Sequence, residues 1–572
     1  MAEVASQYGA LAALVLFIAA SVWLGALAQR VVEKGSFLKG YFLGNRGLGV
    51  WALALTATVQ SGGTFMGFPS YVYKYGWVGS LFIASYMTVP IAGFGIIGKR
   101  IAQISRARGA ITMPDLFRER FASPAIGLFS SLIILIFLST MMIAQFKGGA
   151  IIMKLALSGS GALSEVESPS EKTHATRNAT NAVDSGKDDK SPDDSLASGT
   201  MFYVGLVVFA ATVVGYTLIG GFLAAVWTDL FQSVMMLFGV LILLALSLHA
   251  AGGLTNASRT AIERRGPSVA YAPGYPLTEI VDEETGRERF VSDPTGTSWM
   301  PLAGAVSFFM LWPFSGLSSP ASVVRVMAVK NTSTLRQSIP VLCLYNMCIY
   351  LPIIMIAICT QAVLPDLPEP DEAIPRMTFH VTRDLPGGSL LAGLILAAPF
   401  GAIMATVSSY LVVIASGVVR DIYQRLLRPA ATEREIRTLA HATMIAVGIL
   451  AILANLQPID HLQKMVVFSA TNTGCAFLVP LLMLCYWRRA NAPGTIAAMC
   501  AGVTTVGILY GIGVLKFGWT AFTPLKPLEF DPMIWGNLAA AVVGVVTTYL
   551  TPEPDERLAS KFFDAPEKLP PA

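Results

Sequence analysis

Long apolar runs alternate with short polar segments along almost the whole chain. Several of these runs reach the roughly 20 residues that a helix needs to cross the hydrocarbon core of a bilayer. The pattern therefore predicts an all-α polytopic membrane protein with thirteen transmembrane helices. The predicted spans are 8–28, 48–72, 78–98, 124–155, 201–220, 223–250, 299–324, 338–364, 389–418, 438–456, 463–487, 492–515 and 533–550.

The composition supports this class of protein, because 54% of the 572 residues are hydrophobic and only 13% are charged. Soluble domains usually carry about 25% charged residues. The first apolar run is preceded by Glu3 and by no Lys or Arg, so we expect an uncleaved first span rather than a signal peptide. The small net charge of +4 gives no reason to expect nucleic-acid binding. The six cysteines lie in apolar runs without metal-ligand spacing, so we expect buried thiols.

Lys and Arg gather in the segments that follow odd-numbered spans. Cytoplasmic loops carry an excess of these residues, so we expect the N-terminus outside and the C-terminus inside. The expected location is the plasma membrane, or the inner membrane of a bacterium. The basic segments are 29–47, 99–122, 325–337, 420–437 and Arg488–Arg489.

The chain is interpreted as one transmembrane domain, residues 1–550, followed by a short cytoplasmic tail, 551–572. Residues 157–199 are rich in Ser, Asp, Glu and Lys, with almost nothing apolar after Val166. Such a composition cannot bury enough apolar surface to form a core. We therefore predict a disordered extracytoplasmic insertion there.

Two predicted spans are interrupted by small and polar residues. Span 2 contains SGGT (61–64) and span 7 contains SGLSSP (315–320). Each interruption begins a run of five spans, about 48–250 and 299–487, and because five is odd the two runs have opposite orientations. Broken helices at matching places in inverted repeats indicate the central site of a transporter. The alternative is that the glycines only permit close helix packing. The residues predicted to line a solute site are Ser61, Gly62, Gly63, Thr64, Trp312, Ser315 and Gly316.

Small and weakly polar residues form a stripe along span 9. Ala402, Ala405, Thr406 and Ser409 recur at i, i+3, i+4 and i+7, which places them on one helix face. Hydroxyl oxygens suit a hard cation such as sodium. Tight helix packing is the alternative for this stripe.

Two charged residues within predicted spans are further candidates, because ionisable groups inside a membrane are often functional. Asp229, near the inner end of span 6, would serve the route of a departing cation, or would be a hydrated interfacial acid. Lys147, in span 4, would neutralise a substrate carboxylate, or would extend its ammonium group to the membrane surface.

The sequence resembles the sodium/solute symporter family, particularly its pantothenate- and proline-transporting members. The resemblance lies in TFMGFPSYVYKYGW (64–77), YTLIGGFLAAVWTDLFQ (216–232) and AIMATVSSYLVVIASGVVRDIY (402–423), which are similar to the family's second, sixth and ninth spans. It implies the inverted-repeat fold of the leucine transporter, alternating access and sodium as the coupling ion.

The resemblance also implies a sodium site. Backbone carbonyls of Ala57, Gln60 and Ala402 would bind the ion, with side-chain ligands at positions 405 and 406. Position 405 usually carries Ser, so Ala405 removes one hydroxyl ligand. Sodium would then bind more weakly, or a water molecule would replace the lost oxygen, or a proton would take the place of sodium. Asp229 matches the family's acid on the inward sodium route.

The resemblance does not supply the substrate contacts. Span 7 lacks the family's Gly-Gln-Pro-His run, so contacts cannot be transferred from it, whereas TNTG (471–474) in span 11 offers further polar groups. Lys147 stands where family members carry an apolar residue. The substrate-binding candidates therefore also include Lys147 and Ser409.

The predicted function is import of a small organic solute by a secondary active symporter that uses the sodium gradient. A monocarboxylate or a pantothenate-like anion is favoured by Lys147 and by the second-span motif. The alternatives are proton coupling, a neutral sugar, polyol or amino acid as the solute, or a sensor that binds without transporting. An enzyme is not expected, because the sequence has no paired catalytic carboxylates and no His cluster. We expect no cofactor besides the coupling ion and no obligate protein partner; the expected partners are the solute, Na⁺ and the lipid bilayer.

Overall fold

A computed structural model gives the structure of residues 2–32, 42–43, 46–56, 61–158, 192–265, 267–270, 277–281, 288–292, 300–456, 462–519 and 522–563. Within these ranges the protein is a bundle of helices with one antiparallel pair of strands, β1 (Leu277–Val281) and β2 (Glu288–Ser292). Leu277 pairs with Ser292 and Val281 with Glu288. The fold is therefore all-α in its membrane part, as the apolar pattern predicts.

Ten helices in the described part of the chain are long and apolar enough to cross a membrane, or up to twelve if each of two bent helix pairs is one span. The predicted number of thirteen is not confirmed. Nine elements supply these ten, because α9 contains two of them, Thr200–Ile219 and Ala224–Ala250. The nine are α1 (Ala2–Val32), α8 (Pro124–Ser158), α9 (Pro192–Ala250), α13 (Thr332–Val363), α15 (Gly388–Ser416), α16 (Glu433–Ala454), α17 (Leu462–Tyr486), α18 (Ala492–Phe517) and α19 (Pro532–Leu550).

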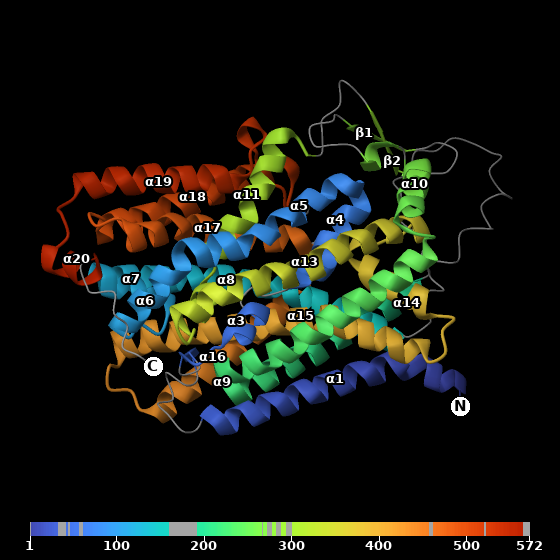
Figure 1. Cartoon of the computed structure of the whole chain (residues 1–572), viewed down its shortest axis with the longest axis horizontal. Coiled ribbons are helices and arrows are strands. Elements are labelled where there is room, and N and C mark those ends of the chain that lie inside the picture. Colours follow the sequence, from blue (N-terminus) through green and yellow to red (C-terminus); the bar gives the residue numbers. More distant parts are fainter. Residues whose placement is uncertain are drawn as a thin grey trace.

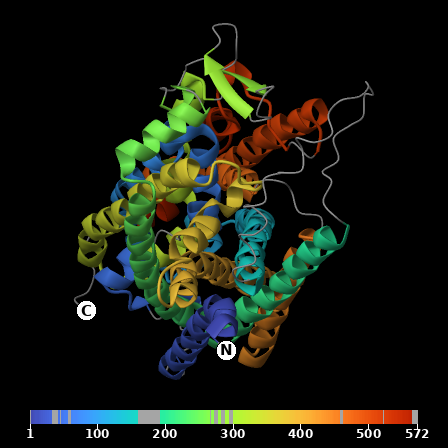
Figure 2. The same ribbon diagram turned by 90° about the vertical axis from the view of Figure 1, so that its right-hand side faces the viewer.

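The long helices run along the longest axis of the molecule (Figure 1). One end carries α10 (Leu254–Arg265), α14 (Ala373–Thr382) and the strands, all from segments predicted to lie outside. Figure 2, which looks at the bundle from this end, places the strands at its edge. The other end carries α6 (Lys99–Arg108), α7 (Met113–Phe121) and α20 (Glu556–Phe563). Which end faces the cytoplasm stays a prediction.

The interruption predicted at 315–320 is confirmed. α11 (Leu302–Ser318) and α12 (Pro320–Met327) meet at 46°, and Ser319 between them has an extended backbone, with φ −60° and ψ 122°. Pro320 explains the break, because a proline disfavours helical backbone in the residue before it and donates no N–H bond.

In predicted span 2 the described chain is α3 (Val50–Thr56), a short π-helix, η2 (Gly63–Gly67), and α4 (Phe68–Tyr75). Residues 57–60 lie outside the described ranges.

A glycine separates predicted spans 5 and 6. Gly221 has φ 57° and ψ −149°, so the backbone of α9 leaves helical geometry at this residue. The same helix begins at Pro192, so the end of the segment predicted to be disordered is helical. The rest of that segment, 159–191, lies outside the described residues.

The most enclosed helix is α15, which carries the predicted sodium stripe. Every side chain from Ile395 to Ser416 is buried. A helix that is apolar all round belongs in the interior of a bundle, where other helices cover each of its faces. The stripe of predicted span 9 thus lies in the interior of the protein.

Candidate functional site

A cavity of about 70 Å³ lies where the interrupted helices meet. Its wall contains five of the predicted solute-site residues, drawn from the start of η2 and from α11. We call it the central cavity. The predicted residues that line it are Ser61, Thr64, Trp312, Ser315 and Gly316.

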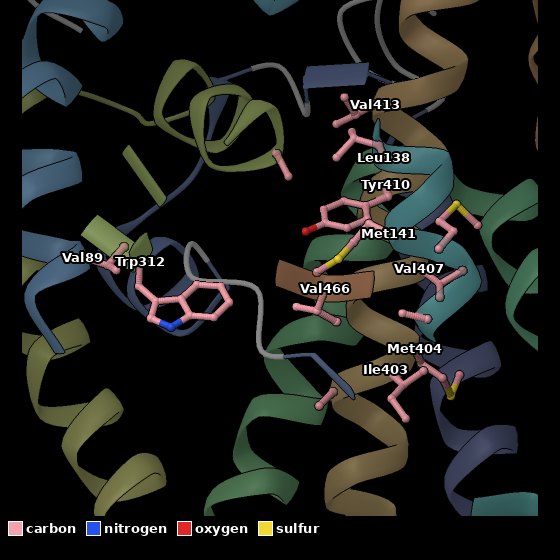
Figure 3. Close-up of a cluster of buried hydrophobic side chains, with 14 of the residues drawn as sticks. Val89, Leu138, Met141, Trp312, Ile403, Met404, Val407, Tyr410, Val413 and Val466 are labelled. Carbon is pink, nitrogen blue, oxygen red and sulfur yellow. The ribbon is translucent and has the colours of Figure 1, made fainter. Parts of the chain in front are cut away.

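The lining of the central cavity is rich in hydroxyl groups and aromatic rings. Trp312 stands on one side, and Met141 of α8 and Tyr410 of α15 face it from the other (Figure 3). No charged side chain lines the cavity among the residues that the structure describes. Further hydroxyl groups come from Tyr86, Ser319, Ser322, Ser469 and Thr473, the last within the TNTG segment.

The Trp312 indole is held in place on two sides. Its Nε1 donates a hydrogen bond of 2.9 Å to the backbone oxygen of Phe82, and its ring packs edge-on against Phe68 at a centroid distance of 5.2 Å. Buried tryptophans usually find such a partner for the N–H group. Trp312 is thus fixed in the wall of the central cavity, and its contact with a solute stays a prediction.

Gly62 and Gly63 do not line the central cavity; they bring helices close together. The backbone N–H of Gly62 donates to Oε1 of Gln145 on α8 at 2.8 Å. A β-carbon on Gly63 would come within 3.1 Å of Oε1 of Gln463 on α17. Both glycines thus permit close helix packing, and their contact with a solute stays a prediction. Sequence reasoning missed both glutamines, each of which lies next to or near a lysine in the sequence.

The structure does not bring Lys147 into the central cavity. Lys147 lines a second, larger cavity of about 720 Å³ between α8, α17 and α18, whose wall is mostly apolar. Its Nζ lies 3.9 Å from Oδ2 of Asp371, which also accepts a 3.2 Å bond from the backbone N–H of Leu462. The ammonium group therefore points toward the segment that carries α14.

Asp229 forms a buried ion pair that sequence reasoning missed. Its Oδ2 lies 2.5 Å from Nη2 of Arg325, and each side chain is only 2% exposed. Ser409 lies between them, accepting from Arg325 at 2.5 Å and contacting Asp229 at 3.4 Å. Ser409 is therefore part of this polar cluster and not of the cavity wall.

The prediction that Arg325 belongs to a basic segment after span 7 is wrong. Arg325 lies on α12, the short helix that follows the break at Ser319, and it is buried. A charge there is tolerable only because a carboxylate meets it. The sequence does hold a signal for this ion pair. Arg325 follows the apolar first turn of α12, and Asp229 is an acid within a predicted span that needs a partner.

The predicted sodium ligands are only partly described. Ala57 and Gln60 lie outside the described ranges, whereas Ala402, Ala405 and Thr406 are buried on α15. The hydroxyl of Thr406 donates a 3.0 Å bond to the carbonyl of Ala402. Two of the predicted ligands are thus hydrogen-bonded to each other one turn apart.

Comparisons with known proteins agree with this architecture. A family model of the sodium:solute symporter family matches residues 41–163 and 195–502. The sodium/pantothenate symporter of Escherichia coli is 28% identical over 546 residues, which cover 94% of this chain and 98% of the relative. The sodium/proline symporter of Haemophilus influenzae is 25% identical over 570 residues, which cover 97% and 96%.

Two solved structures share the fold. A Na⁺-coupled sialic acid symporter in a substrate-bound outward-open state has a TM-score of 0.65 and 18% identity, covering 96% of this chain and 99% of that chain. A nucleobase-cation-symport-1 family transporter in a closed conformation has a TM-score of 0.50 and 12% identity, covering 91% and 98%.

The matched residues include all three motifs on which the family resemblance depends, and the relatives align over nearly their whole length. The protein is therefore a multi-pass membrane transporter and not an enzyme. The chain belongs to the sodium:solute symporter family.

Proposed function

We propose that this symporter imports a pantothenate-like organic carboxylate together with sodium, by alternating access of two inverted repeats. The observation that carries the proposal is the central cavity, which lies at the interruption of predicted span 7 and beside that of span 2. Half-helix ends at such interruptions offer backbone groups to a solute and an ion. Relatives named as sodium/pantothenate symporters support the choice of solute.

The chemistry of the lining agrees with a solute of this kind. Pantothenate carries two hydroxyl groups and an amide besides its carboxylate. The hydroxyls of Ser61, Thr64 and Ser315 can exchange hydrogen bonds with such groups, and the Trp312 ring can pack against its apolar part.

The size of the cavity implies movement. A cavity of about 150 Å³ holds a benzene molecule, so a cavity of about 70 Å³ is too small for pantothenate. The helices around it must move apart for the solute to enter. Such rearrangement of one repeat against the other is what alternating access requires.

Sodium is proposed to bind beside the stripe of α15, through the carbonyl of Ala402 and the hydroxyl of Thr406. The backbone carbonyls of Ala57 and Gln60, which lie outside the described ranges, are the other proposed ligands. The intrahelical bond between Thr406 and Ala402 would turn toward the ion when sodium binds. Ser409 lies about one turn further along α15 than Thr406, and its hydroxyl contacts Asp229 of α9, which is on the proposed inward route. The loss of a hydroxyl at Ala405 keeps proton coupling as the alternative.

A neutral polyol or sugar is the second candidate solute. The specific observation that favours it is the lining of the central cavity, which has no charged side chain among the described residues. Hydroxyl groups and an aromatic wall suit a polyhydroxylated neutral molecule as well as they suit the uncharged part of pantothenate.

The test is uptake into proteoliposomes that contain the purified protein. We expect an inward sodium gradient to drive accumulation of labelled pantothenate, and replacement of sodium by choline to abolish it. Labelled myo-inositol, glucose and proline serve as the neutral and zwitterionic comparisons. Accumulation of a neutral solute without pantothenate would overturn the choice of substrate. Uptake that ignores sodium but collapses with the proton gradient would overturn the coupling ion, and binding without accumulation would indicate a sensor.

A further inference from the structure

A separate cavity of about 330 Å³ carries a concentration of positive charge. It lies at the end of the bundle that carries α14, and Pro370 forms part of its wall. Three lysines from three different elements line it: Lys74 of α4, Lys464 of α17 and Lys526 of the segment before α19. We call this cavity the vestibule.

Among the described lining residues, one aspartate accompanies the three lysines. Asp531 also lines the vestibule, and its Oδ2 lies 4.0 Å from Nζ of Lys526. Asp371, which is near in sequence to Pro370, bonds instead to the backbone of Leu462 and approaches Lys147. The lining residues therefore carry more positive than negative charge.

The vestibule and the central cavity have walls from the same helices. α11 contributes Phe308 to the vestibule and Trp312, one turn further along, to the central cavity. α17 likewise contributes the neighbouring residues Val467 and Val466. On α4, Phe68 lines the central cavity, and Ser70, Tyr71 and Lys74 line the vestibule.

An aromatic layer separates the two cavities. The rings of Phe82 and Phe308 lie 4.4 Å apart, and Phe82 also packs edge-on against Tyr71 at 5.3 Å and Trp312 at 5.8 Å. The ammonium group of Lys526 lies 5.2 Å from the centre of the Phe308 ring. A charged solute would meet the lysines before it reached these rings.

We propose that the vestibule is an entry site that captures the carboxylate of the solute before the solute passes the aromatic layer into the central cavity. This inference rests on the proposed function and adds the place where the negative charge is recognised. Half-buried ammonium groups in a concave, partly apolar site attract a carboxylate more strongly than exposed lysines do, because the low-dielectric walls focus their field. The uncharged lining of the central cavity can then serve the rest of the molecule.

Uptake kinetics with two probes test the proposal. Labelled pantothenate is the substrate. Panthenol, its neutral alcohol analogue, is the competitor, and both are measured in proteoliposomes. For Lys464→Gln we expect the KM for pantothenate to rise by about threefold to tenfold, with kcat changed less than about twofold, since steering acts on association. The inhibition constant of panthenol is expected to stay the same. Raising ionic strength with choline chloride at constant sodium should shrink the difference in KM.

Two further variants keep the test independent of folding. Asp531→Asn removes the only carboxylate among the described lining residues and should lower the KM for pantothenate, the opposite direction from Lys464→Gln; asparagine can still cap α19. Lys516→Gln is the matched control, because Lys516 is an exposed lysine in the last turn of α18 and does not line the vestibule.

The outcomes separate the two proposals. An unchanged KM in both vestibule variants, or a loss of kcat alone, would overturn the entry site while sodium-driven pantothenate uptake stood. A wild-type protein that does not take up pantothenate and is not occupied by panthenol would overturn the proposed function and the entry site with it.

Discussion

A methyl group occupies position 405 of α15, where the family resemblance leads us to expect a serine hydroxyl. Ala405 is buried, and the hydroxyl of Ser408 in the same helix donates to the carbonyl of Ala405 at 3.1 Å. That hydroxyl is therefore already used within α15. The proposed sodium site lacks one oxygen for this reason.

Ala405→Ser should strengthen sodium binding. A restored hydroxyl adds one oxygen ligand for a hard cation. We therefore expect the sodium concentration for half-maximal uptake to fall by about threefold to tenfold, which corresponds to the net free energy of one hydrogen bond. Ala415→Ser, further along the same buried helix, is the control. Identical sodium dependence in wild type and Ala405→Ser would count against this position as a ligand.

The pair between Asp229 and Arg325 predicts a non-additive effect on stability. Asp229→Asn or Arg325→Gln alone leaves one buried charge without its partner, which should cost about 3–5 kcal/mol of folding free energy. The double variant should be more stable than either single variant, because no net charge remains buried. Thermal unfolding of the purified protein measures this. Additive losses in the double variant would contradict the coupling.

Sequence reasoning predicted the position of a residue best where no distant partner decides the direction of its side chain. Trp312 and hydroxyl residues of the two interruptions line one cavity, and their contact with the solute stays a prediction. Lys147 does not, because the direction of a long side chain depends on neighbours such as Asp371, which is distant in sequence. Arg325 was misplaced for the same reason, since its partner Asp229 lies on another helix.

At the scale of the helices, Gly221 sets the geometry between predicted spans 5 and 6. Its backbone, with φ 57° and ψ −149°, lies in a region that is essentially restricted to glycine. The break explains why one continuous apolar segment can supply two spans.

Gly221→Ala should destabilise the protein by about 1–3 kcal/mol, because a β-carbon is strained in this backbone conformation. Gly215→Ala in the same helix is the matched control, since a β-carbon there meets nothing within 4 Å and its φ is not positive. Thermal stability and surface expression of the two variants should therefore differ. Equal stability would mean that α9 passes position 221 without the break.

The breaks themselves were predictable to different degrees. Ser, Gly and Pro at 315–320 predict the interruption before α12, because Pro320 disfavours helical backbone in the residue directly before it. The helical start of α9 at Pro192 was not predicted, since its residues are polar and their composition resembles a disordered segment. The remaining disordered prediction, for 159–191, concerns residues outside the described ranges.

For the whole molecule, the sidedness inferred from Lys and Arg can be tested directly. The segments predicted to be outside share one end of the bundle, and the basic segments around α6 and α7 share the other (Figure 1). The number of spans decides whether the two termini lie on opposite sides. It stays a prediction, because two bent helix pairs can each be read as one span or two.

Cysteine labelling in intact cells should resolve this orientation. Asp384 and Arg434 are exposed and lie in segments predicted to be outside and inside, respectively. We expect a membrane-impermeant maleimide to label Asp384→Cys in intact cells and Arg434→Cys only after permeabilisation. The wild type gives the background from its six cysteines. The reverse pattern of labelling would invert the topology and place the vestibule on the cytoplasmic side.

The environment of Trp312 has an optical consequence. Its indole forms part of the cavity wall, with its N–H bonded to the carbonyl of Phe82 and the Tyr86 ring 5.3 Å away. Indole emission shifts with the polarity of the surroundings, so a solute that displaces water from this wall would change the colour and intensity of the light that Trp312 emits. With the other eight of the nine tryptophans replaced by phenylalanine, this one ring would report the occupancy of the cavity in real time, without a label on the solute.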